Sequence, residues 1–203
     1  MKLKNLCVSK SKFFYIYIKN INEFLIALLL LPFILGLVLI VSFIHVIIYR
    51  SNPIFLSERV GLKNEKFVIF KLRTMKDNAP IMATGDLGDA KLYITGLGRF
   101  LRKYSLDELP QFLNVLKGEM SIVGPRPSLG SQVELNQYRE KYGVSELRPG
   151  ITGLAQIIYR DHASDKLKAR VDRIYFKKIS LCLDIWIMLL TVKHVAFPRN
   201  VRH

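Results

Sequence analysis

Two adjacent carboxylates, Asp107 and Glu108, have the residue types and the position that best suit chemistry on a phosphate-bearing molecule. They lie just ahead of Pro110, and proline, which has no N–H group, is tolerated in the first turn of a helix. We therefore expect a helix N-cap at or just after Asp107, where the helix dipole favours an ionised carboxylate and attracts phosphate. Adjacent helical residues point about 100° apart, so the two carboxylates are expected to have different roles.

A purely structural interpretation of the same pattern stays open. Ser105 lies three residues before Glu108, which is the spacing of a capping box. Acidic residues are also common in the first turn of a helix, where they do no chemistry. The residues alone therefore leave both catalysis and capping open.

Arg126 and Arg148, each of which adjoins a proline, are candidates for phosphate contact. Residues 66–75 alternate in polarity and predict a β-strand, which places Lys71 and Arg73 on one face. Arg126 lies between two prolines, and such a rigid turn suits bidentate phosphate binding. A solvated strand end and an ordinary exposed turn are the alternatives for these two positions.

Longer motifs accompany the pair in order along the chain. They read Ser-Leu-Asp-Glu-Leu-Pro-Gln (105–111), Asn-Val-Leu-Lys-Gly-Glu-Met-Ser (114–121), Val-Gly-Pro-Arg-Pro (123–127) and Arg-Pro-Gly-Ile-Thr-Gly-Leu-Ala-Gln (148–156). Together they closely resemble the bacterial sugar transferase family, the monotopic phosphoglycosyl transferases. The resemblance runs from about Phe24 to about Val195.

The resemblance implies transfer of a sugar 1-phosphate from a UDP-sugar to polyprenyl (undecaprenyl) phosphate, with release of UMP, to initiate bacterial surface glycan synthesis. It implies that Asp107 is the nucleophile that forms an aspartyl phosphosugar, and that Glu108 binds Mg²⁺. The resemblance also implies phosphate contact for Lys71 and Arg73, whose strand resembles the segment that lines the active site in the family. It implies the same for Arg102, which lies five residues before Asp107 and matches an arginine in relatives. The chain departs from the family at Leu154, where many relatives have Trp, and at residues 157–160, so the sugar and nucleotide preference is not carried over.

Composition suggests one modest domain with additional segments and anionic partners. The chain has 203 residues, half of them apolar, and a formal net charge of +15. An anionic bilayer, a diphosphate substrate and nucleic acid all suit this charge. We expect no nucleic-acid partner, because aromatic and basic residues are not interleaved and no binding motif occurs. Cys7 and Cys182 have no disulfide or metal spacing. A membrane-tethered nucleic-acid binder and a non-enzymatic scaffold are the alternative functions, and the sequence sets no oligomeric state.

The segment from Phe24 to Tyr49 carries no formal charge and predicts a membrane helix. As a straight helix it would be about 39 Å long, more than the ~30 Å hydrocarbon core. Pro32 interrupts it and both flanks are basic, so a Pro-broken, re-entrant helix is expected, with a kinked spanning helix as the alternative. The family resemblance also implies re-entry, although the chain has Leu-Pro where the family often has Ser-Pro.

The C-terminal region predicts two further helices. Residues 169–178 are basic and helical in pattern, and residues 179–197 are an apolar stretch broken by Asp184 and Lys193, which suits an interfacial or core helix. Trp186 could lie at the headgroup boundary or in the core. We therefore expect an α+β monotopic membrane protein, with a membrane segment (1–50) and a small, largely helical catalytic domain (51–203) on the cytoplasmic face of the bacterial inner membrane.

Overall fold

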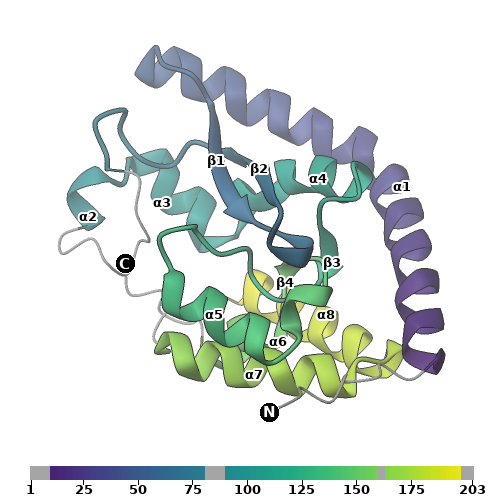
Figure 1. Ribbon diagram of the computed structural model, residues 1–203. Helices are drawn as coiled ribbons and strands as arrows, with labels where there is room; N and C mark the ends of the chain where they lie inside the picture. Colours follow the sequence, from purple (N-terminus) through teal and green to yellow (C-terminus); the bar gives the residue numbers. More distant parts are fainter. Residues whose placement is uncertain (1–9, 81–89, 160–162, 198–203) are drawn as a thin grey trace.

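The computed structural model of the chain describes residues 10–80, 90–159 and 163–197, and it is an α+β structure in which helices predominate (Figure 1). The predicted class, with a long apolar N-terminal helix, is confirmed at this level. The elements are, in order, α1 (Lys10–Tyr49), β1 (Ile54–Val60), η1 (Leu62–Asn64), β2 (Lys66–Leu72), α2 (Ala90–Tyr93), α3 (Gly96–Lys103), η3 (Leu106–Gln111), α4 (Phe112–Leu116), β3 (Ser121–Val123), α5 (Val133–Lys141), η4 (Val144–Glu146), β4 (Gly150–Thr152), α6 (Leu154–Tyr159), α7 (Asp165–Lys178) and α8 (Leu181–Ala196).

Helix α1 forms a long bent arm around the remaining elements (Figure 1). It stays helical through Pro32, so the chain bends within one helix rather than breaking into two. At ~1.5 Å per residue its 40 residues extend about 60 Å. By length and composition the segment Lys12–Tyr49 could cross a membrane.

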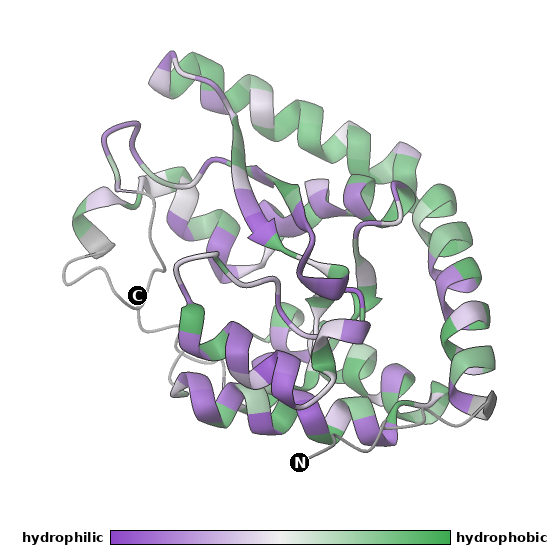
Figure 2. Ribbon diagram, viewed as in Figure 1, coloured by the Kyte–Doolittle hydropathy of each residue, from purple (hydrophilic) through white to green (hydrophobic). Residues whose placement is uncertain are grey.

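The exposure pattern of α1 is the reverse of that in a water-soluble helix. Phe33 and Phe43 are 75% and 69% exposed, whereas Lys19 and Glu23 are buried. Figure 2 shows that most of the α1 ribbon is hydrophobic, with hydrophilic residues interspersed in its N-terminal part. Lipid is the solvent that such a surface suits, because exposed apolar patches of this extent are rare on monomeric soluble proteins.

A buried polar network ties α1 to the globular part. The Lys19 ammonium lies 3.0 Å from Glu23 Oε1 and 2.6 Å from Asp184 Oδ2 on α8, and it donates a hydrogen bond of 2.8 Å to the carbonyl of Val123. Glu23 accepts one of 3.1 Å from the Val123 N–H group, and the Tyr175 hydroxyl donates to Asp184 at 2.7 Å. Two carboxylates therefore share one buried cation next to strand β3.

Replacing Lys19 with Met is expected to lower the free energy of unfolding by ~3–5 kcal/mol, because it leaves two buried carboxylates without their cation. Denaturant unfolding in detergent micelles measures the change. The control is Lys66→Met, which removes the solvent-exposed pair with Glu58 and should cost ~0–1 kcal/mol. Equal losses in the two variants would contradict a stabilising role for the network.

Four short strands form two separate pairs. Strands β1 and β2 make an antiparallel hairpin, with Phe55 opposite Lys71 and Arg59 opposite Phe67. Strands β3 and β4 pair in parallel, which brings the Val-Gly-Pro-Arg-Pro motif beside the Arg-Pro-Gly-Ile-Thr-Gly motif. A Cβ atom added at Gly150 would lie only 2.1 Å from the Gly124 nitrogen, so this close backbone approach requires glycine.

The C-terminal helices agree with the predicted pattern. The segment expected at 169–178 lies in α7, and the apolar stretch at 179–197 contains α8. Trp186 on α8 is 49% exposed, which excludes burial in the core and leaves the surface alternative. Asp184 on the same helix is buried in the network with Lys19, so the charge that interrupts the apolar stretch has a structural partner.

Candidate active site

The two carboxylates lie in η3, a tight helical turn that begins earlier than predicted. The N-cap is Ser105, not a residue at or after Asp107, and its φ of +52° is left-handed. Its side chain makes no capping hydrogen bond, so the capping-box alternative is also wrong. An N-cap normally needs extended backbone to aim its oxygen at the helix, and the Ser105 conformation does not provide that. The backbone closes the turn instead, with the Glu108 N–H group bonded to the Ser105 carbonyl at 3.3 Å.

Glu108 is held by two cations from different parts of the chain. Its Oε1 atom lies 2.8 Å from the Lys71 ammonium at the end of β2, and 3.1 Å from Nη2 of Arg126 in the Pro-Arg-Pro turn. Burial opposes ionisation here, but Lys71 and Arg126 outweigh it and lower the pKa of Glu108 to about 2. Glu108 is therefore a permanent carboxylate at neutral pH.

Asp107 has a different electrostatic environment, although it is the adjacent residue. It is only 9% exposed, and burial raises the pKa of its carboxyl above the ordinary value. Lys71 lowers that pKa, the charge of Glu108 raises it, and Arg102 lowers it. Two adjacent carboxyl groups with pKa values shifted in opposite directions are typical of a site in which the two have different tasks.

The β1–β2 hairpin supplies one wall of this site. Cross-strand partners share a face, so Arg59, Ile69 and Lys71 point to the same side. Together with Glu108, Gln111, Arg126 and Pro127 they line an open hollow, whose empty space is about 240 Å³ when the part open to solvent is included. Burial lowers the pKa of Arg59 to about 10, which leaves it charged at neutral pH.

Two side-chain donors, on residues that line this hollow, have no acceptor among the described residues. They are Nε of Arg59 and Nε2 of Gln111, and both atoms are buried. A buried donor without a partner is costly, and an anionic ligand in the hollow would remove that cost. Neither residue was predicted from the sequence. Gln111 ends the Ser-Leu-Asp-Glu-Leu-Pro-Gln motif, and a hairpin register would have placed Arg59 on the Lys71 face.

A buried asparagine fixes η3 and α4 against strand β2. The Asn114 side chain accepts a hydrogen bond of 3.1 Å from the Phe70 N–H group and donates one of 2.7 Å to the Val68 carbonyl. The same amide nitrogen donates another hydrogen bond, of 2.7 Å, to Glu119. This side chain occupies the strand edge as a neighbouring strand would, and so sets the separation between Lys71 and the carboxylates.

The five predicted phosphate-contact residues do not all lie together. Lys71 and Arg126 lower the pKa values of both Glu108 and Asp107, and Arg102 lowers the pKa of Asp107. Nε of Arg102 also donates a hydrogen bond of 2.8 Å to the Thr74 hydroxyl. The structure pairs Arg73 with Asp77 instead. The Arg148 guanidinium lies beside Gly118, within 3.5 Å of where a Cβ atom would stand there. Arg73 and Arg148 are therefore placed outside the group around Asp107 and Glu108.

A divalent cation would suit the carboxylates only together with oxygen atoms from a substrate. Among the described residues, no three His, Cys, Asp or Glu side chains form a cluster that could hold a metal ion. Both ion pairs of Glu108 use Oε1, and a carboxylate has about four acceptor positions on its two oxygens. Mg²⁺ commonly takes one or two carboxylates, with substrate phosphates and water completing its shell. The residues present fit that pattern.

The sequence of this chain matches a known protein family over almost its whole length. A family model described as bacterial sugar transferase matches residues 14–198, a span that includes both carboxylates, the hairpin and the Pro-Arg-Pro turn. The chain belongs to the bacterial sugar transferase family.

Three related sugar transferases show what this chain resembles. It is 41% identical over 154 residues to the uncharacterized sugar transferase EpsL of Bacillus subtilis. The aligned residues make up 75% of this chain and 74% of EpsL. It is 36% identical over 192 residues to the UDP-N-acetylgalactosamine-undecaprenyl-phosphate N-acetylgalactosaminephosphotransferase of Aeromonas hydrophila, covering 89% of this chain and 44% of that protein. A UDP-glucose:undecaprenyl-phosphate glucose-1-phosphate transferase of Klebsiella pneumoniae is 36% identical over 187 residues, covering 86% of this chain and 39% of that protein. This sugar transferase thus spans less than half of the latter two relatives.

Proposed function

We propose that this sugar transferase moves a sugar 1-phosphate from a UDP-sugar to polyprenyl (undecaprenyl) phosphate and releases UMP, as an initiating step of bacterial surface glycan synthesis. The observation that carries the proposal is the hollow beside Glu108, where Arg59 and Gln111 offer buried donors without acceptors. Phosphate oxygens are the acceptors that this group of cations suits best. The names of the Aeromonas and Klebsiella relatives supply the substrate classes.

In the first step, an oxygen of the Asp107 carboxylate attacks the β-phosphorus of the UDP-sugar. A new P–O bond forms to Asp107 while the bond from that phosphorus to the bridging oxygen breaks, and UMP leaves with the bridging oxygen. Carboxylates form such acyl phosphates in other phosphoryl-transfer enzymes. Lys71, Arg59 and Arg126 neutralise charge on the phosphate oxygens, and positioning with charge neutralisation supplies most of the catalysis in this chemistry.

In the second step, a phosphate oxygen of polyprenyl phosphate attacks the same phosphorus. The bond to Asp107 breaks and restores its carboxylate, and the sugar remains joined to the lipid through a diphosphate. The raised pKa of Asp107 makes its carboxylate more basic and therefore more nucleophilic in the first step, and the positive charges of Lys71, Arg102 and Arg126 favour its ionised form, which helps it to leave in the second. Mg²⁺ held by Glu108 and the diphosphate would supply further charge neutralisation at the phosphate oxygens.

The acid limb of kcat/KM for UMP release is expected to lie above the ordinary aspartate pKa of ~3.9. The nucleophile must be ionised, and burial raises the pKa of Asp107, so activity is lost on acidification at a higher pH than for an exposed aspartate. Glu108, with a pKa of about 2, adds no limb in this range. A pH–rate profile measures the limb. Lys71→Met should move it to still higher pH, because Lys71 lowers the pKa of Asp107; a limb below pH 4 in both proteins would contradict the assignment.

We also propose that α1 enters the bilayer and returns, so that both ends of the chain and the catalytic domain lie on the cytoplasmic face of the inner membrane. The bend of α1 and the polar anchor at Lys19 and Glu23 support this arrangement. Through Lys19, this anchor holds the N-terminal part of α1 against β3 and α8. A helix that spans the membrane would instead carry that arm to the opposite side.

The two native cysteines offer a direct test of this topology. A Cys182→Ser variant keeps Cys7 as the only thiol, and a Cys7→Ser variant keeps Cys182, which is exposed on α8. In intact spheroplasts, neither variant is expected to react with a membrane-impermeant maleimide, and both should react after lysis. Labelling of Cys7, but not Cys182, in intact spheroplasts would show that the helix spans.

A screen of UMP release across UDP-sugars, with polyprenyl phosphate supplied in mixed micelles, tests the proposed function. At least one UDP-sugar is expected to give UMP together with a lipid-linked sugar diphosphate, detected by luminescence and by mass spectrometry. UMP without the lipid product would indicate hydrolysis instead of transfer. Absence of UMP from every UDP-sugar would overturn the proposal.

A further inference from the structure

The turn that carries Arg126 is held at its flanks by backbone hydrogen bonds. The Gly124 N–H group bonds to the Thr152 carbonyl at 2.8 Å, and the Pro125 carbonyl accepts from the Gly150 N–H group at 2.8 Å. On the other side, the Val60 N–H group bonds to the Ser128 carbonyl at 2.9 Å. These bonds fix both ends of the turn and leave its apex, Arg126, to be held in another way.

A buried arginine outside the catalytic hollow holds that apex. Nη1 of Arg139, on α5, donates a hydrogen bond of 2.8 Å to the carbonyl oxygen of Arg126. The same guanidinium donates to Oδ2 of Asp172 on α7 through Nε at 2.9 Å and Nη2 at 2.7 Å. Arg139 is 9% exposed and Asp172 is 2% exposed. One planar group thus joins two helices and the apex of the catalytic turn.

This arrangement uses the geometry of arginine and more than its charge. The guanidinium offers five N–H donors in a fixed plane, so Asp172 can fix its orientation while another N–H group reaches the Arg126 carbonyl. A buried ion pair of this kind contributes little net stability relative to apolar residues, and orientation is the role that such pairs can serve. The Arg126 residue whose carbonyl accepts from Arg139 also places its Nη2 atom 3.1 Å from Oε1 of Glu108.

We propose that Arg139, oriented by Asp172, is a positioning residue that sets the Arg126 turn so that the Arg126 guanidinium faces Glu108 and the substrate diphosphate. The claim about the turn stands on the contacts above, and its catalytic consequence rests on the proposed function. Arg139 does not itself touch the hollow with Glu108. Its effect on the reaction passes through Arg126.

Hydrogen exchange of residues 124–128 tests the structural part without any need for activity. Pro125 and Pro127 have no amide hydrogen, so this segment reports on Gly124, Arg126 and Ser128 alone. Arg139→Lys keeps the positive charge beside Asp172 and removes the planar fork. We expect exchange in this segment to become ~5- to 10-fold faster, because a local opening needs one hydrogen bond fewer.

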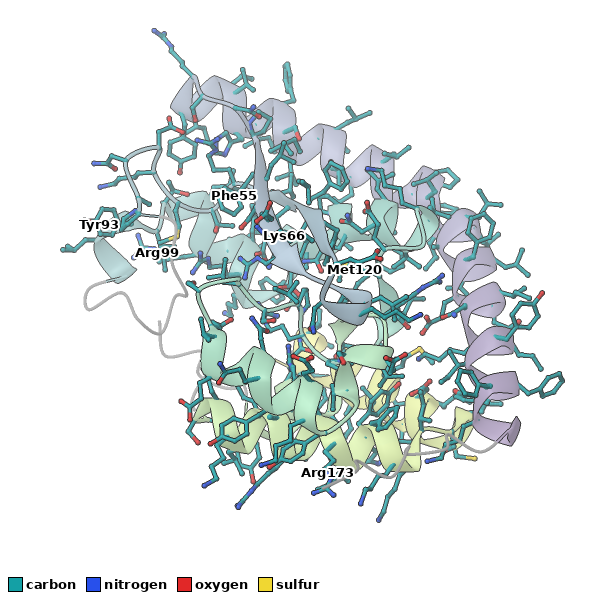
Figure 3. The ribbon with its side chains drawn as sticks, in the orientation of Figure 1. Phe55, Lys66, Tyr93, Arg99, Met120 and Arg173 are labelled. Carbon is teal, nitrogen blue, oxygen red and sulfur yellow. The ribbon has the colours of Figure 1, made fainter. Side chains whose placement is uncertain are left out.

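The matched control is Arg173→Lys on α7. Figure 3 shows Arg173 at the outer edge of the molecule, and its guanidinium lies 4.9 Å from the ring centre of Tyr142, away from the turn. This variant should leave exchange in residues 124–128 and UMP release unchanged. Unchanged exchange in Arg139→Lys as well would overturn the proposal.

A double-mutant cycle tests the functional part. Alone, Arg139→Lys is expected to lower kcat/KM for UMP release by ~10- to 100-fold, as small displacements of a positioned group commonly do. In an Arg126→Ala background the same change should have an effect of less than about 2-fold, because the group that Arg139 positions is gone. Equal losses in the two backgrounds would overturn positioning through Arg126 and would identify a general structural role.

The cycle remains informative if Arg139→Lys loosens the whole fold. A general loss of structure lowers activity equally with and without the Arg126 side chain, whereas positioning does not. Failure of the proposed function has a different signature: the wild-type protein would release no UMP from any UDP-sugar, and the exchange measurement would still decide whether Arg139 holds the turn.

Discussion

Asp107→Asn is expected to abolish transfer, lowering UMP release by roughly 10⁴- to 10⁶-fold, the range seen when a covalent nucleophile is removed. Asn has nearly the same shape as Asp but carries no ionised oxygen to attack phosphorus. Because Asp107 is not the helix N-cap, this change removes no capping bond, and the folded structure should be retained. Wild-type protein incubated with the correct UDP-sugar and no polyprenyl phosphate should release a burst of UMP and gain the mass of one phosphosugar.

The control for this experiment is Asp165→Asn, which alters an aspartate paired with Lys168 at the start of α7, away from the hollow. It should retain both the burst and the mass adduct. The Asp107→Asn protein should show neither while still binding UDP. An adduct on Asp107→Asn, or kinetics in which UMP appears only when both substrates are present, would rule out Asp107 as the nucleophile.

Local sequence patterns predicted several helices and strands correctly, because the type of such an element depends mainly on residues that are close together in the sequence. Alternation at 66–75 predicted a strand that the structure shows as β2, and the apolar stretch at 179–197 predicted a helix that it shows as α8. The predicted start of η3, at or just after Asp107, was wrong because it rested on the position of one proline. Pro110 was assigned to the first turn, whereas Ser105 adopts a left-handed conformation that starts the turn earlier, and residue types alone rarely reveal this for serine.

The parts that could not be predicted depend on contacts between distant segments. Lys19 belongs to the basic flank that precedes the membrane helix, but it is buried in an ion pair with Asp184, more than 150 residues away. Arg59 enters the site only through the register of the hairpin. Of the basic residues selected from sequence, Arg126 is the one whose rigid turn was recognised in advance, because two prolines mark it locally.

Removal of Mg²⁺ by a chelator is expected to reduce UMP release by at least about 10³-fold, and Mg²⁺ added back should restore it. The physical reason lies in the charges. A UDP-sugar diphosphate brings two negative charges, and Glu108 adds a third that already engages Lys71 and Arg126. The attacking Asp107 carboxylate would bring a fourth. Lys71, Arg59, Arg102 and Arg126 only balance these four charges, and Mg²⁺ would supply the further positive charge that favours the developing charge on the phosphate oxygens in the transition state.

A Glu108→Gln variant separates a metal role of Glu108 from a merely structural one. Gln can still accept hydrogen bonds from Lys71 and Arg126, but it is a weaker Mg²⁺ ligand than a carboxylate. The variant is therefore expected to need at least ~10- to 100-fold more Mg²⁺ for half-maximal UMP release, because losses of this size follow even the removal of a residue that only supports a metal ligand. The surface change Glu58→Gln, which affects only the exposed pair with Lys66, should leave the Mg²⁺ requirement unchanged. Asp107→Asn should stay inactive at every Mg²⁺ concentration, because metal cannot replace a missing nucleophile. Full activity of wild-type protein in chelator, or an unchanged Mg²⁺ requirement in Glu108→Gln, would leave Glu108 as an ion-pair partner that orients Lys71 and Arg126.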